Sequence, residues 1–183
     1  MEKTISQYTS IVEKSRTIFD EKMLDYGSTW RVFRPQSLID QLFIKAKRIR
    51  SIQENSGKQM IEDTIEGEFY AIYNYCIMFL IQLRLDFTDK PDLDFIKAGE
   101  LYEIESNKVK ELMIAKNHDY GEAWRDMKIS SMADFILIKL FRINQILQNE
   151  GKTRISEGIE SNISDIANYS VFALILLNEN KLL

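Results

Sequence analysis

The chain contains an internal repeat, and this repeat constrains its fold more than any other feature. When the 183-residue sequence is shifted by 94 positions, it aligns with itself without a gap from Lys22/Lys116 to Leu83/Leu177. The stretches KMLDYGSTWRVF and KNHDYGEAWRDM show the match most clearly, because both contain Lys-x-x-Asp-Tyr-Gly-x-x-Trp-Arg. A repeated sequence indicates a repeated structural unit, so we expect two copies of one fold.

Weaker matches extend each unit toward its N-terminus. We therefore predict repeat one at residues 4–83, a connector at 84–97 and repeat two at 98–177. A unit of roughly 80 residues buries too small a share of its surface to be more than marginally stable alone. The two repeats should therefore pack together as one compact domain.

Each repeat has the sequence pattern of helices. Seven Gly and two Pro are too few for a turn-rich β architecture. Gly27 and Gly121 should end the first helices, and Ser37 and Ser131 should cap the second helices. The expected helices cover about 5–24, 37–53 and 63–83 in repeat one, and about 100–118, 131–148 and 157–177 in repeat two. The fold class is therefore all-α, a helical bundle of two tandem repeats related by a pseudo-twofold axis.

Composition and charge exclude several classes of protein. The net charge of -4 provides no general basic field, so nucleic acid is an unlikely partner. Cys76 is the single cysteine, which rules out a disulfide within the chain and suits the cytoplasm. The longest apolar run, residues 69–83, is shorter than the ~20 residues that a membrane-spanning helix needs.

A lysine interrupts the apolar stripe of the second helix in each repeat. Lys139 and Lys45 occupy equivalent places in these stripes, and Arg142 and Arg48 follow three residues later. An unpaired buried ammonium group is costly, so each lysine should face an anion. The third helices supply acidic candidates before they become apolar on all sides: Asp63 and Glu66 in repeat one, and Glu157, Glu160 and Asp165 in repeat two.

These acids allow two interpretations. Carboxylates at three- and four-residue spacing are common metal ligands in helical bundles, and Mg²⁺ needs few of them. On that hypothesis the metal ligands are Glu157, Glu160, Asp165, Asp63 and Glu66. On the other hypothesis, the acids form structural ion pairs with Lys139 and Lys45.

The repeated motif also allows two interpretations. It either ends a helix and fills the space between helices, or it binds a nucleotide, with an aromatic ring on the base and cations on phosphate. Together with the cations of the second helices, the predicted nucleotide-binding residues are Lys22, Asp25, Tyr26, Trp30, Arg31, Lys45, Arg48, Lys116, Asp119, Tyr120, Trp124, Arg125, Lys139 and Arg142.

Residues 116–146 and 150–175 resemble the nucleotide modification associated domain type 1 family, formerly a bacterial domain of unknown function. This resemblance implies a role around modified or non-standard nucleotides. The wider pattern is similar to the all-α pyrophosphohydrolases of the MazG and dimeric dUTPase group, which bind Mg²⁺ through paired acids. That similarity implies Glu157 and Glu160 as catalytic residues. The chain departs from it at Asn168 and Ala71, where acids would be expected.

We therefore expect a cytoplasmic helical protein that binds a nucleotide, with Mg²⁺ as its cofactor. If it is an enzyme, the reaction is hydrolysis of a nucleoside triphosphate between the α and β phosphates. The alternative is a non-catalytic bundle that senses nucleotides or binds another protein. The sequence also leaves a homodimer open.

Overall fold

The computed structural model describes residues 1–55, 57, 63–152 and 157–180. This part of the chain is helical throughout and contains no strand. It forms six α-helices and two short 3₁₀ helices: α1 (Glu2–Tyr26), η1 (Thr29–Val32), α2 (Pro35–Glu54), α3 (Ile65–Leu85), α4 (Phe95–Tyr120), η2 (Ala123–Asp126), α5 (Ile129–Gln148) and α6 (Ile159–Asn180). None of the helices among these residues is long and apolar enough to span a membrane.

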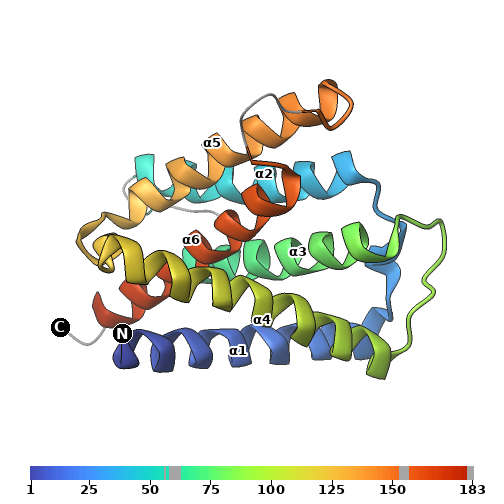
Figure 1. Cartoon of the computed structure of the whole chain (residues 1–183), viewed down its shortest axis with the longest axis horizontal. Helices are drawn as coiled ribbons and strands as arrows, with labels where there is room; N and C mark the ends of the chain where they lie inside the picture. Colours follow the sequence, from blue (N-terminus) through green and yellow to red (C-terminus); the bar gives the residue numbers. More distant parts are fainter. Residues whose placement is uncertain (56, 58–62, 153–156, 181–183) are drawn as a thin grey trace.

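The helices form three layers of two, and each layer contains the same helix from both repeats (Figure 1). Helices α3 and α6 make the middle layer, α2 and α5 cover one side, and α1 and α4 cover the other. Each helix therefore packs against its own counterpart. This arrangement confirms the predicted all-α bundle of two tandem repeats.

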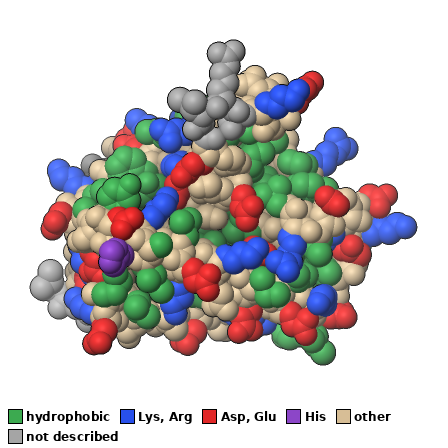
Figure 2. Space-filling model, in the orientation of Figure 1, with side chains coloured by type: hydrophobic (Ala, Val, Ile, Leu, Met, Phe, Trp, Pro, Cys, Tyr) green, Lys and Arg blue, Asp and Glu red, His purple; other side chains and the backbone are tan. Residues whose placement is uncertain are grey.

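The middle layer forms because α3 and α6 are apolar around most of their circumference. In α6 every residue from Asn162 to Leu176 except Tyr169 is buried. A helix that is apolar on all sides needs cover on all sides. The outer helices have mixed surfaces, and Figure 2 shows acidic and basic side chains interspersed over one face of the molecule.

The ends of the helices match the prediction at the glycines but not at the serines. Gly27 and Gly121 follow α1 and α4 with φ of 59° and 62°, a conformation that a side chain disfavours. The predicted N-caps were wrong, because Ser37 and Ser131 lie inside the first turns of α2 and α5. Helix α2 begins two residues earlier at Pro35, whose fixed φ and missing N–H suit the first turn.

Two equivalent hydrogen bonds join the repeats through the core. Tyr8 of α1 donates to Oδ1 of Asn168 at 2.8 Å, and Tyr102 of α4 donates to Oδ1 of Asn74 at 2.7 Å. Each asparagine also donates its amide to a main-chain carbonyl in the first helix of its own repeat. All four side chains are buried. Each asparagine therefore links the first helices of both repeats.

The connector between the repeats is held by Arg31, whose side chain is only 2% exposed. Its Nε donates to Oδ1 of Asp92 at 2.8 Å, and its Nη1 donates to the main-chain carbonyl of Asp86 at 3.1 Å. The hydrogen bond from Arg31 lowers the pKa of the Asp92 carboxyl group. Arg31 thus ties the segment between α3 and α4 to η1.

We expect Asn168→Asp to lower the free energy of unfolding by about 2 kcal/mol, measured by urea denaturation. A carboxylate can still accept from Tyr8 but cannot donate to the carbonyl of Val109, so that hydrogen bond is lost and a carboxylate faces a carbonyl oxygen in the core. The exposed Asn107→Asp is the control and should change stability by less than about 0.5 kcal/mol. Equal effects of the two substitutions would contradict this role for Asn168.

Candidate functional site

Two cavities occupy equivalent places in the two repeats. Each lies between the end of the repeat's first helix, its 3₁₀ helix and its third helix, and their volumes are about 570 Å³ in repeat one and 430 Å³ in repeat two. The equivalent residues that line both are Lys22/Lys116, Tyr26/Tyr120, Trp30/Trp124, Asn74/Asn168 and Tyr75/Tyr169. Three of these pairs belong to the repeated motif, so the motif builds a cavity twice.

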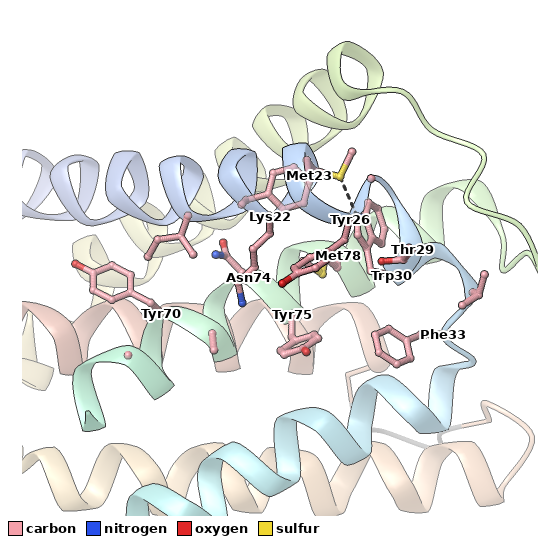
Figure 3. A pocket seen from close by; sticks show the side chains of 16 residues that line it. Lys22, Met23, Tyr26, Thr29, Trp30, Phe33, Tyr70, Asn74, Tyr75 and Met78 are labelled. Carbon is pink, nitrogen blue, oxygen red and sulfur yellow. Dashed lines mark hydrogen bonds between the residues drawn. The ribbon is translucent and has the colours of Figure 1, made fainter. Parts of the chain in front are cut away.

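The cavity of repeat one has aromatic walls. Trp30 is buried and donates its indole N–H to the sulfur of Met23 at 3.3 Å, which fixes the ring (Figure 3). Phe33 and Tyr75 meet edge to face with ring centroids 6.3 Å apart. Tyr26 is 66% exposed and extends from the end of α1. The cavity therefore combines rigid aromatic walls with an exposed ring.

Polar groups with spare hydrogen-bonding capacity also line this cavity. Among the described residues, the hydroxyl groups of Thr29 and Tyr75 make no hydrogen bond, nor does the ammonium group of Lys22. Lys22 is also the one charged side chain among the described lining residues. The cavity can thus offer a cation and hydroxyl groups to a ligand.

The cavity of repeat two contains a neutralised cluster of charges. Asp165 is buried and binds Lys116 through Oδ1 and Lys139 through Oδ2, the latter at 2.7 Å. Burial opposes the charge on Lys116, but the hydrogen bond and charge of Asp165 outweigh it and raise its pKa. Burial, followed by the charge of Asp165, raises the pKa of Tyr169. The prediction that Lys139 faces an anion is confirmed.

In repeat one the equivalent lysine binds a different acid. Lys45 contacts Oε2 of Glu68 at 3.0 Å, and Glu68 is only 3% exposed. Arg48 binds the same carboxylate and also contacts Asp63 at 2.8 Å. Sequence analysis missed Glu68, which lies three residues before Ala71, the counterpart of Asp165. Neither Lys45 nor Glu68 lines the cavity.

Comparison with known proteins identifies a family. The family described as Nucleotide modification associated domain 1 matches residues 22–83 and, a second time, residues 116–177. The two matches have the same register as the internal repeat. The chain belongs to this family. No curated protein and no solved structure matches the chain significantly. Similarity to the MazG group is therefore not shown.

In this member of the nucleotide modification associated domain 1 family, Glu157 and Asp165 line the same cavity, but no third predicted metal ligand groups with them among the described residues. Glu157 and Glu160 are exposed, and Glu157 accepts a hydrogen bond from Ser161. Asp63 binds Arg48, and Glu66 contacts Lys14 at 3.2 Å. Among the residues whose positions are described, no three His, Cys, Asp or Glu side chains form a group that could hold a metal ion.

The donor set therefore does not fit a Mg²⁺ centre in this arrangement. Asp165 is the buried acid of the set, and lysine ammonium groups already contact both of its oxygens. A metal would have to displace these cations. The catalytic roles of Glu157 and Glu160 remain predictions from the sequence resemblance.

The motif arginines of this family member lie outside the two cavities. Arg31 holds the connector, and Arg125 contacts Glu122, Glu179 and Gln7, which fixes η2 to α1 and α6. The guanidinium group of Arg125 also lies 4.5 Å from the ring centroid of Trp124. Asp25 and Asp119 are exposed and line neither cavity. The lysines, tyrosines and tryptophans of the motif thus line the cavities, whereas its arginines hold neighbouring segments in place.

Trp124 itself is enclosed by the protein. Its ring stacks on Phe172 with centroids 4.3 Å apart and an interplanar angle of 3°, and its indole N–H donates to Asn117. Tyr120, at 74% exposure, is the accessible motif ring of repeat two. The sequence left open whether Trp124 or Tyr120 would stack on a nucleotide base, and the exposed Tyr120 suits that role better than the enclosed Trp124. The identity of Tyr75 and Tyr169 between repeats was the signal for this further pair of cavity residues.

We expect Asp165→Ala to lower the free energy of unfolding by about 3 kcal/mol, because it leaves Lys139, whose side chain is only 13% exposed, without a counter-charge. The double variant Lys139→Met/Asp165→Ala should recover most of this loss, because it removes that charge as well. Thermal and urea unfolding of both variants measure the effect.

The exposed pair of Lys97 and Glu100 provides the control. Glu100→Ala should cost less than about 1 kcal/mol, because water screens that pair. If Asp165→Ala behaves like Glu100→Ala, the buried cluster has no special importance for stability.

Proposed function

We propose that the protein binds a nucleotide in an aromatic cavity of the kind that the repeated motif builds. The observation that carries the proposal is the recurrence, at the same 94-residue offset, of a cavity with a lysine and an exposed tyrosine beside buried aromatic rings. The family's description associates the chain with nucleotide modification. A nucleotide is the ligand class that matches both the chemistry and the family.

The cavity volumes and the character of the lining support this ligand class. Small-molecule sites commonly measure about 300–1,000 Å³ and combine apolar walls with a few polar groups. A planar base suits the space beside Tyr75 and Phe33, where aromatic faces and edges favour stacking. The hydroxyl groups of Thr29 and Tyr75, which make no hydrogen bond with any described residue, suit the polar edge of a base or a sugar.

The proposed activity is binding, without metal-dependent hydrolysis. Three of the acids in the predicted metal set are already paired with cations: Asp165 with Lys116 and Lys139, Asp63 with Arg48, and Glu66 with Lys14. A metal ion would have to displace these cations. This pairing favours the non-catalytic interpretation of the sequence. A sensing or carrier role agrees with a site that holds a nucleotide and leaves its phosphates intact.

Isothermal titration calorimetry with nucleoside mono-, di- and triphosphates, each with and without Mg²⁺, tests the proposal. Binding should occur without Mg²⁺, and a ligand at a hundred times its dissociation constant should stabilise the protein by about 2.7 kcal/mol. A failure of every nucleotide to bind or stabilise the protein would contradict the proposal. Binding only with Mg²⁺, accompanied by release of pyrophosphate, would restore the hydrolytic hypothesis.

Loss of stacking surface should weaken binding of the same nucleotides. We expect Tyr75→Ala to raise the dissociation constant roughly tenfold, because base–aromatic stacking contributes about 1–3 kcal/mol. Phe141→Ala is the matched control, since Phe141 is an aromatic residue of α5 that is 55% exposed and lines neither cavity. Equal affinities of the two variants would place the nucleotide elsewhere.

A further inference from the structure

The two cavities share a framework but differ in charge. Where repeat one has Ala71, repeat two has Asp165, and this substitution changes what each motif lysine can do. Lys116 is bound to Asp165, whereas Lys22 has no ion pair or hydrogen bond with the residues that the structure describes. The described lining residues therefore give repeat one a net positive cavity, while Lys116 and Lys139 balance Asp165 and Glu157 in repeat two.

Glu68, the buried acid of repeat one, pairs with Lys45 and Arg48 and makes no ion pair with Lys22. Glu68 lies one helical turn before Ala71 and binds Lys45 and Arg48, outside the cavity lining. In repeat two, Asp165 binds the lysines of both the first and second helices. A shift of the acid by one turn thus keeps the lysine of the second helix paired and leaves Lys22 without a partner among the described residues.

The apolar lining of the two cavities also differs, and it leaves more space for a ligand in repeat one. Phe172 stacks on Trp124 in repeat two, and its counterpart in repeat one is the flexible Met78. Repeat one has the larger cavity, about 570 Å³ against 430 Å³. Both charge and space therefore favour a ligand in repeat one.

Resting on the proposed function, we infer that the cavity of repeat one is the nucleotide site, and that it takes a free nucleoside monophosphate, with Lys22 on the phosphate. The ammonium group of Lys22, the one charge among the described lining residues, complements one phosphate group but not the charge of a triphosphate. Figure 3 shows Lys22 extending from α1 toward α3, on the side of the cavity opposite Phe33. The cavity of repeat two is self-neutralised by Asp165 and does not bind the same ligand.

Exchange of the distinguishing residues between the repeats tests the inference. The probes are the 5′-monophosphates of adenosine, guanosine, cytidine, uridine and thymidine, with the free nucleosides alongside, measured by calorimetry. The wild-type protein should bind one equivalent of a monophosphate, at least tenfold more tightly than the nucleoside. Ala71→Asp should weaken monophosphate binding at least tenfold, because the new carboxylate pairs with Lys22 as Asp165 pairs with Lys116.

Ala71→Asn is the control for size, since it adds nearly the same volume without charge, and it should leave affinity within about threefold. The reciprocal variant, Lys139→Met/Glu157→Gln/Asp165→Ala, removes both acids that face Lys116 and should raise the number of monophosphates bound from one to two. Far-UV circular dichroism and thermal unfolding establish that each variant is folded. Should the triple variant fail to fold, the comparison of Ala71→Asp with Ala71→Asn decides by itself.

Specific outcomes would overturn the inference while leaving nucleotide binding intact. These are equal losses in Ala71→Asp and Ala71→Asn, two sites in the wild type, equal affinity for nucleosides and monophosphates, or tighter binding of triphosphates. Tighter binding of a 5′-phosphorylated single-stranded oligonucleotide would overturn the assignment to a free nucleotide. If the wild type binds no nucleotide at all, the proposed function fails together with the inference.

Discussion

The reciprocal hydrogen bonds between Tyr8 and Asn168 and between Tyr102 and Asn74 are the contacts on which the architecture depends. They place the first helix of one repeat against the third helix of the other. A buried amide can accept from the tyrosine and donate to a carbonyl at the same time, whereas a carboxylate can only accept. Asn168, where the resemblance to the pyrophosphohydrolases leads one to expect an acid, is therefore the residue type that this core requires.

The same asparagines border the two cavities, so the scaffold and the candidate site share residues. The repeated motif likewise contributes both to the scaffold and to the cavities. Its tryptophans and arginines are committed to contacts within the protein, with Arg31 on the connector and Arg125 on α1 and α6. Its lysines and tyrosines line the cavities. A rigid framework of buried aromatic rings thus presents the few groups that remain accessible to a ligand.

The two repeats share the same helix packing but differ in where the buried acid of the third helix lies. In both repeats the lysine of the second helix pairs with a buried acid of the third helix, because a buried carboxylate without a counter-charge is costly. The acid occupies position 68 in one repeat and 165 in the other, one turn apart when the repeats are superposed. The pairing requirement is satisfied in both repeats, but only one acid also reaches the motif lysine.

The sequence by itself determined the all-α class, the two repeats and their helices, the glycine helix ends and the need for an anion near Lys139. These follow from local periodicity, from an offset of 94 residues and from the cost of burying charge. Only the tertiary structure decided that Glu68 pairs with Lys45, that Arg31 and Arg125 hold the scaffold together, and that Lys22 has no partner among the residues whose positions are described. Partners are set by where helices cross, and a shift of one helical turn, about 5.4 Å, changes which side chains meet without changing the pattern along the chain.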